Sequence, residues 1–422
     1  MPAVRERIDR WAARTPRPVR ALGALAGPAA VFGFLVGAIR LEDPLMFALF
    51  CSSGGVLVWL LRRSGVLGVL RAFGDEHRVL TIVAGASAML AFPLTQLQSA
   101  VWIRVAVLGA VYAALALGLN IVVGRTGLLD LGYAAFFGIG AYAAAMTSSC
   151  TGCPIAFPMP WLASLLASAV IGALFGVLLG FPVLRLRGDY LAVVTLGFGE
   201  IVRVALNNLD HVPLAGINLT NGPNGLFGVG QPRLGPVDLG TPFSLFGLEL
   251  PSILKYYYVA LLLTLLIVLV VRRLDRSRIG RAWTAIREDE LAARAMGINT
   301  TTTKLLAFAS GAFFGGIAGN VFVHFQTGTS PADFSFDLSI LVLAMVVLGG
   351  MGNVAGVVVG SVLLVALPEK LRFVEEFRYL FLGLSLMLMM RFRPEGLLPE
   401  KRRQRELATQ AGGPDVVVPV ET

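Results

Sequence analysis

The sequence has few of the residues that build catalytic or metal sites. It holds three His and three Cys, which form neither an H-x-x-x-H pair nor two C-x-x-C sets. A zinc enzyme, an iron–sulfur protein or a haem carrier is therefore not expected. No Gly is followed by Lys, so the G-x-x-x-x-G-K-[ST] loop that holds ATP phosphates is missing too. Charged residues make up only 14% of the chain, against about a quarter in soluble proteins.

Apolar residues are abundant instead. The residues AVILMFWYC account for 56% of the 422. Leaving out the 8 Tyr and adding the 48 Gly gives roughly 65% apolar, whereas soluble proteins show about 45 to 50% on that basis. A soluble domain could not cover this much apolar surface. The composition therefore predicts a polytopic membrane protein, and its long apolar runs predict an all-α one.

About twelve membrane segments follow from the apolar runs. A helix needs about 20 apolar residues to cross the hydrocarbon. The stretch 338–367 is too long for one crossing and carries the helix-breaking Gly349–Asn353, so two short crossings or a re-entrant pair are expected there. The other ten segments are 21–39, 45–61, 79–96, 102–123, 126–147, 161–184, 190–207, 253–271, 305–325 and 377–392.

The distribution of basic residues predicts the orientation. With both termini in the cytoplasm, most of the 35 Lys and Arg lie on the cytoplasmic side, as the positive-inside rule requires. The net charge of +9 thus indicates cytoplasmic loops and not a nucleic-acid partner. The predicted organisation is a basic cytoplasmic N-terminus (1–20), two N-terminal helices (21–78), a membrane core (79–395) and a cytoplasmic tail (396–422). The core includes a long outer loop of turns (208–252) and a long cytoplasmic loop (272–304).

The cytoplasmic segment 272–304 is the most informative part of the chain. Residues 282–296 contain neither Gly nor Pro and predict one helix, which Gly297 would end. An apolar stripe of Ala282, Ile286, Ala293 and Met296 would face one side. From periodicity alone the helix is either a solvated surface helix or a docking helix for a soluble partner.

Five stretches, in this order, resemble the permease subunits of bacterial branched-chain amino-acid ABC importers, and most closely the larger of the two paired permeases. The similarity extends from about residue 100 to 395, and two extra N-terminal helices are typical of the larger subunit. The stretches are Leu117–Gly124, Gly127–Tyr133 with Gly138–Tyr142, Leu184–Arg203, Gly280–Ile298 and Val347–Gly352.

The resemblance implies the ABC importer permease fold and a multi-pass protein of the bacterial inner membrane. It implies a second homologous permease, two cytoplasmic ATPases that bind ATP, and an extracytoplasmic amino-acid binding protein as partners. This chain itself would be no enzyme and would hold no cofactor or metal. The 272–304 segment would then be the coupling loop, with the ATPase-coupling residues Ile286, Arg287, Glu288, Asp289, Glu290, Ala292, Ala293 and Gly297.

Four polar residues within apolar segments are candidates for the translocation path, because charges at membrane depth are costly. They are Asn120, Asp130, Glu200 and Arg203. Glu200 and Arg203 are three residues apart on one predicted helix, so they either pair with each other or line the path. Asn120 either braces helices or lines the path.

Other features have a structural interpretation. Gly residues recur every fourth position in three predicted helices, which favours close helix packing: Gly172/Gly176/Gly180, Gly311/Gly315/Gly319 and Gly352/Gly356/Gly360. Cys150 and Cys153 are either incidental thiols or a local disulfide on the outer side. His324 is expected to pack at a helix end.

Two alternative functions stay open from the sequence. Importers of urea or short amides, or of other amino acids, use similar permeases. An ion-coupled secondary transporter would need a coupling-ion site at the membrane midplane, for which the charged residues are candidates. It would leave the docking helix without a role.

Overall fold

The computed structural model describes residues 17–41, 76–96, 99–148, 157–183, 189–210, 218–235, 237–245 and 248–370, with isolated positions between 43 and 73, at 150, and between 380 and 398. These residues fall into two compact units, Met1–Ile103 with Lys370–Glu375 and Arg104–Glu369 with Glu376–Thr422. In the first unit, α2 (Arg17–Arg40) packs against α5 (Arg78–Thr95). The expected segments 45–61 and 377–392 and the tail 396–422 lie largely outside the described residues.

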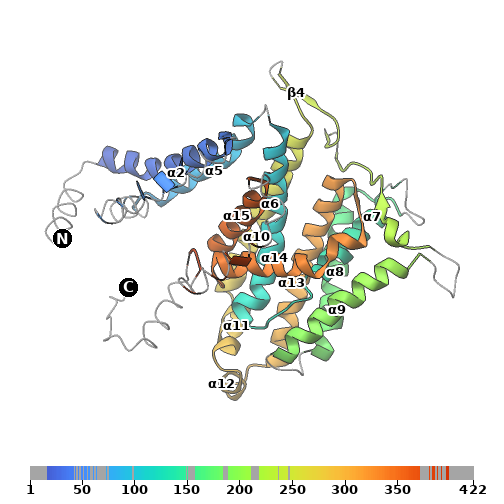
Figure 1. The fold of residues 1–422 in the computed structure, drawn as a ribbon. Coiled ribbons are helices and arrows are strands. Elements are labelled where there is room, and N and C mark those ends of the chain that lie inside the picture. The colour runs from blue at the N-terminus through green and yellow to red at the C-terminus, as the bar shows by residue number, and fades with distance from the viewer. Residues whose placement is uncertain are drawn as a thin grey trace. The chain divides into compact units, whose positions relative to one another are not determined.

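Within the described residues, five helices are long and apolar enough to cross a membrane, which confirms five of the expected spans. The first is α6 (Ala100–Leu119), which continues as the π-helix η1 (Asn120–Arg125). The other four are α8 (Trp161–Val183), α9 (Asp189–Asn208), α10 (Ile253–Arg276) and α13 (Thr300–Gln326) (Figure 1).

The core of the second unit forms where α13 packs between α8 and α7 (Ala134–Met146). Glycine makes this close approach possible. A Cβ on Gly176 would lie 2.9 Å from the Phe308 carbonyl oxygen, and one on Gly319 would lie 2.7 Å from the Ala141 nitrogen. The expected packing role is therefore confirmed for the Gly rows of α8 and α13. In the third row only Gly356 and Gly360 are helical, because Gly352 lies in the turn before α15.

A buried polar network fixes the same helices to one another. Asn320 on α13 accepts a hydrogen bond from Trp161 Nε1 (3.0 Å) and donates to Ser164 Oγ (3.0 Å) and Ser168 Oγ (3.1 Å) on α8. His324 packs near the end of α13, as expected, and its Nε2 lies 2.8 Å from Ser148 Oγ. These buried groups have their partners within the chain, so the α8–α13 pair is a rigid scaffold.

Two of the expected segments are broken, one as predicted and one not. Residues 338–367 form α14 (Phe336–Gly349) and α15 (Val354–Lys370), joined by a turn over 350–353, as the Gly-rich sequence predicted. The prediction of one span over 126–147 is wrong, because only Ala134–Met146 is helical. Gly127 has a φ of +71°, and the Asp130 side chain binds the Gly132 backbone N–H, which favours a turn over a helix.

The 208–252 segment, expected as a long outer loop, contains short hairpins. A 3₁₀ turn (η2, Gly222–Asn224) precedes β1 (Leu226–Phe227), which pairs antiparallel with β6 (Gly328–Thr329) so that Leu226 faces Thr329. The hairpins pair β2 (Arg233–Leu234) with β3 (Val237–Asp238) and β4 (Phe243–Leu245) with β5 (Leu248–Leu250). Cys150 forms an isolated bridge with Val229 of this segment and is disulfide-bonded, whereas Cys153 lies outside the described residues. A second 3₁₀ turn, η3 (Pro331–Phe334), leads into α14.

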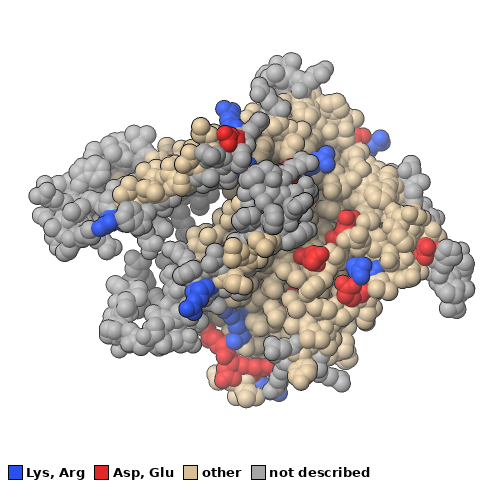
Figure 2. Space-filling view, viewed as in Figure 1, with Lys and Arg blue, Asp and Glu red and all other residues tan. Residues whose placement is uncertain are grey.

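The 272–304 segment forms two helices instead of the single one expected over 282–296. These are α11 (Arg278–Glu288) and α12 (Glu290–Ala295), which meet at Asp289. Asp289 Oδ1 accepts hydrogen bonds from the backbone N–H groups of Leu291 (2.8 Å) and Ala292 (3.0 Å), so Asp289 is the N-cap that starts α12. Charged side chains gather over α11 and α12, whereas apolar and uncharged residues cover most of the helices above them (Figure 2).

Candidate functional site

The non-helical stretch between η1 and α7 lies against α9. Asp130 and Gly132 are in this stretch, and Asp130 is fully buried. Asp130 Oδ1 accepts from the Gly132 N–H (2.9 Å), and Thr195 Oγ1 of α9 accepts from the Leu131 N–H (3.0 Å). Non-helical backbone at membrane depth is tolerated only where protein buries it or where it lines a cavity. We therefore expect this stretch to be covered by protein or to line a cavity.

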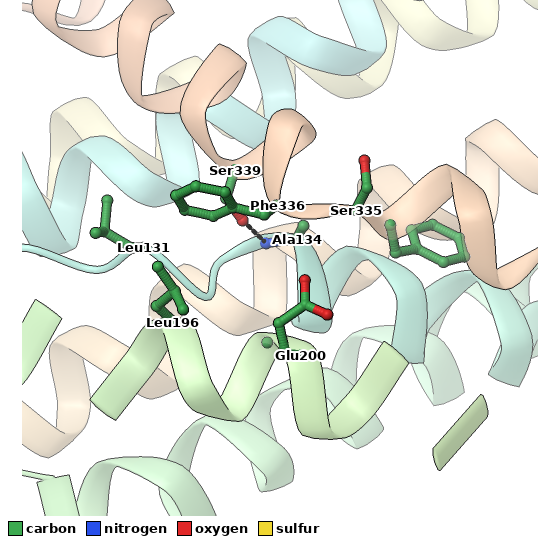
Figure 3. A pocket seen from close by; sticks show the side chains of 9 residues that line it. Leu131, Ala134, Leu196, Glu200, Ser335, Phe336 and Ser339 are labelled. Atoms are coloured by element: carbon green, nitrogen blue, oxygen red, sulfur yellow. Dashed lines mark hydrogen bonds between the residues drawn. The ribbon is translucent and has the colours of Figure 1, made fainter. Parts of the chain in front are cut away.

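A small pocket opens beside this stretch, where α7 and α14 both begin (Figure 3). Ser339 Oγ of α14 accepts a hydrogen bond from the Ala134 N–H (3.1 Å), which joins the two helix starts. Glu200 reaches the pocket from α9. The lining residues are Leu131, Ala134, Leu196, Gly199, Glu200, Phe334, Ser335, Phe336 and Ser339.

Glu200 and Arg203 form the ion pair that their spacing predicts. Arg203 Nε and Nη2 both lie 2.8 Å from Glu200 Oε2. The side chains are 37% and 35% exposed in the isolated chain, although they lie within the span Tyr190–Asn208. Facing an ion pair toward hydrocarbon is costly. Their exposure therefore indicates that protein or water covers this part of α9.

Asn120 lies at the start of η1 and braces two segments. It is fully buried, and its Oδ1 accepts a hydrogen bond from the Gly352 N–H (2.8 Å) in the α14–α15 turn. Of the two interpretations that the sequence left open, the structure favours bracing. Among the four path candidates, the pocket lining includes Glu200 but not Asn120, Asp130 or Arg203.

The α11–α12 segment has a buried side and an exposed side. Trp283, Ile286 and Ala293 are buried, and Trp283 Nε1 donates to the Thr303 carbonyl oxygen (2.8 Å). Ile286 and Ala293 were expected among the residues that contact the ATPase. That expectation is corrected for these two, because both side chains pack into this chain. Leu291 and Met296 are 65% and 83% exposed instead.

The charged residues of this segment divide between internal contacts and the surface. Arg287 Nη1 donates to the Gly124 carbonyl oxygen at the end of η1 (2.6 Å). Glu290 pairs with Lys304 (2.8 Å) on α13. Glu288, Asp289 and Ala292 are exposed. Gly297 has a φ of +86° and follows Met296, the C-cap of α12, in agreement with the predicted helix end.

Sequence reasoning missed several residues of the site. Thr195, Ser335 and Ser339 carry little signal because isolated hydroxyls are common in apolar helices. The ion pair between Arg125 and Asp275 (2.7 Å), which joins η1 to α10, connects residues far apart in the chain. Spacing rules could not find it. Among the described residues, no group of three or more His, Cys, Asp or Glu could hold a metal ion.

Comparison with known proteins relates this geometry to a family. The family model described as "Branched-chain amino acid transport system / permease component" matches residues 101–390. The match includes the broken segments, the pocket and the α11–α12 segment. No solved structure matches the chain.

Three relatives illustrate the range of similarity. LivM of Escherichia coli (strain K12), a "high-affinity branched-chain amino acid transport system permease protein", is 44% identical over 73% of this chain and 72% of its own length. BraD of Pseudomonas aeruginosa, named in the same way, is 26% identical over 69% of this chain and 92% of its own. LivH of Salmonella typhimurium, again so named, is 24% identical over 61% of this chain and 80% of its own.

Proposed function

Because this chain belongs to the family of branched-chain amino acid transport system permease components, we propose that it carries Leu, Ile and Val across the bacterial inner membrane as one permease subunit of an ABC importer. The observation that carries the proposal is the 44% identity over 73% of the chain to a permease with that named substrate class. The family is a transport permease and not an enzyme, and ATP hydrolysis belongs to a separate subunit.

The proposed assembly supplies what this chain lacks. LivM and LivH of Salmonella typhimurium carry the name of one transport system, which supports a second homologous permease beside this chain. Two cytoplasmic ATPases would bind ATP beneath the 272–304 segment, and a binding protein would deliver the amino acid to the 208–252 segment outside. Both termini of this chain would lie in the cytoplasm. Membrane lipid would cover its apolar helices.

The translocation path is proposed to pass the pocket between α9 and the start of α14. The half-exposed Glu200–Arg203 pair would face the second permease and a water-accessible path, since lipid there would be unfavourable. The Glu200 carboxylate would contact the ammonium group of the substrate in transit. The fully buried Asn120 and Asp130 would hold the broken backbone that shapes the path.

Reconstitution tests the function. We expect this chain, its partner permease and the ATPases to copurify from native membranes, and the assembly in proteoliposomes to accumulate leucine only with ATP and binding protein. The chain alone should not accumulate leucine, since it has no phosphate-binding loop. Accumulation by the chain alone against a gradient would contradict the proposal and favour an ion-coupled transporter. Uptake of urea in place of leucine would reassign the substrate.

Cysteine labelling tests the orientation. Asn224 in the 208–252 segment and Glu288 at the end of α11 are both exposed. In intact cells, a Cys at 224 should react with a membrane-impermeant maleimide, and a Cys at 288 should react only after permeabilisation. Cys150, which is disulfide-bonded, would be unreactive in both variants. The reverse pattern would contradict the proposed topology.

A further inference from the structure

A contact between the α11–α12 segment and a broken membrane helix passes through Arg287. Its Nη1 donates to the carbonyl oxygen of Gly124 (2.6 Å), near the end of the π-helix η1. Its side-chain stem packs at Gly127, where an added Cβ would lie 3.1 Å from Arg287 Cγ. Carbonyl groups at a helix end lack intrahelical partners, and a cation there is favourable. Arg287 therefore caps η1 from a different part of the chain.

Gly124 is also where η1 meets the α14–α15 turn. The Asn120 side chain joins these two segments by accepting from the Gly352 N–H (2.8 Å). A Cβ on Gly124 would lie 2.7 Å from the Gly352 nitrogen and would also overlap the Asn120 side chain. Three segments therefore meet at Gly124 without space for one further atom. A displacement of the Gly124 backbone must displace Asn120 and Gly352 as well.

Other contacts of the α11–α12 segment lead to a continuous helix. Trp283 and Glu290 bind Thr303 and Lys304, which lie in the first turns of α13. That helix is fixed to α8 by the glycine contacts and by the Asn320 network. The contact of Arg287 instead leads to a π-helix, a geometry that is rare and frequently lies at functional sites.

We propose that Arg287 is the positioning residue that transmits movement of α11 and α12 to the broken helices of the translocation path. The movement would pass from the Arg287 guanidinium to the Gly124 carbonyl, and from there through Asn120 to the α14–α15 turn. The inference rests on the proposed function, in which ATPases act on the α11–α12 segment. It adds a defined route between that segment and the helices around the pocket.

The test measures coupling in the complete importer. Arg287→Met keeps the apolar stem at Gly127 but removes every N–H donor, and Arg287→Lys restores a cationic donor. Leucine uptake and ATP hydrolysis are measured in the same proteoliposomes. For Arg287→Met we expect the ATPases to remain bound and to hydrolyse ATP within about twofold of the wild-type rate, while leucine transported per ATP falls at least about tenfold. Arg287→Lys should recover part of that ratio.

Arg281→Met is the matched control. Arg281 lies on the same helix, is exposed, and donates to the Arg276 carbonyl oxygen (3.0 Å) without reaching η1. Its uptake per ATP should equal that of the wild type. Because this ratio does not depend on the amount of complex per vesicle, a lower folded yield of Arg287→Met would not obscure the result.

Three outcomes decide the proposal. A wild-type ratio of uptake to ATP in Arg287→Met would overturn it, and so would an equal loss in Arg281→Met. Loss of ATPase binding in Arg287→Met would also overturn it, since Arg287 would then act in docking. Failure of the wild-type chain to bind ATPases would instead refute the proposed function.

Discussion

Replacing both Leu291 and Met296 with Glu should abolish ATPase binding to this chain, and leucine uptake with it. These two side chains lie at the ends of α12 and are 65% and 83% exposed in the isolated chain. In helix-in-groove docking, such apolar side chains are the anchors. Truncating an anchor costs about 2 kcal/mol or more, and each 1.4 kcal/mol is about a tenfold change in affinity. Two buried charges should therefore weaken binding by at least about a thousandfold, which ATPase pull-down and ATP hydrolysis in the assembled importer would measure.

Two controls separate docking from folding. Thr301→Glu adds an acidic residue at an exposed position in the first turn of α13, where helices tolerate acidic residues, and should leave ATPase binding unchanged. Ala293→Glu places a charge in the buried side of α12 and should lower folded yield instead of selectively removing ATPase binding. Normal pull-down of the ATPase by the Leu291→Glu/Met296→Glu double variant would refute the docking role of this exposed face.

Exchanging the charges of Glu200 and Arg203 should restore folding but not transport. Glu200→Gln leaves the Arg203 charge unpaired within a membrane span, at a cost of up to about 3 kcal/mol, so folded yield should fall. The double variant Glu200→Arg/Arg203→Glu re-forms an ion pair at the same spacing and should recover most of that yield. It also puts a cation at the pocket, where the substrate ammonium would pass. Leucine uptake should therefore stay at less than about a tenth of the wild-type rate.

The measurements are folded yield after detergent extraction and leucine uptake in proteoliposomes at equal amounts of protein. Recovery of uptake together with yield would show that the pair acts only in structure. Normal yield and normal uptake in Glu200→Gln would exclude both roles. Ser310→Ala is a suitable control for substitution within a span, because the Ser310 hydroxyl donates to the carbonyl oxygen of Ala307 on the same helix (3.0 Å).

The membrane class could be predicted from the sequence because the lipid environment constrains the sequence directly, whereas the importer class followed from the resemblance of five stretches to a known family. A span must be apolar over about 20 residues, so α6, α8, α9, α10 and α13 follow from composition alone. Local rules also predicted local contacts. The spacing of Glu200 and Arg203 predicted their ion pair, and the Gly-rich run predicted the break between α14 and α15.

The tertiary structure decided what local patterns cannot specify. The break over 127–133 depends on Thr195 of α9, which binds the Leu131 backbone, and the burial of Ala293 depends on packing beneath α12. Hydrophobic periodicity distinguishes apolar from polar faces but does not say which apolar face packs inside one subunit and which meets a partner.

The sequence by itself therefore determined the membrane class, most of the spans and the segment that projects from them. The tertiary structure determined the pocket at Glu200, the exposed face at Leu291 and Met296, and the contact between Arg287 and Gly124. The physical reason is the length scale of the interactions. Hydrophobicity and helix spacing act over neighbouring turns, whereas the Arg287 contact joins residues 163 positions apart and exists only after the helices have packed.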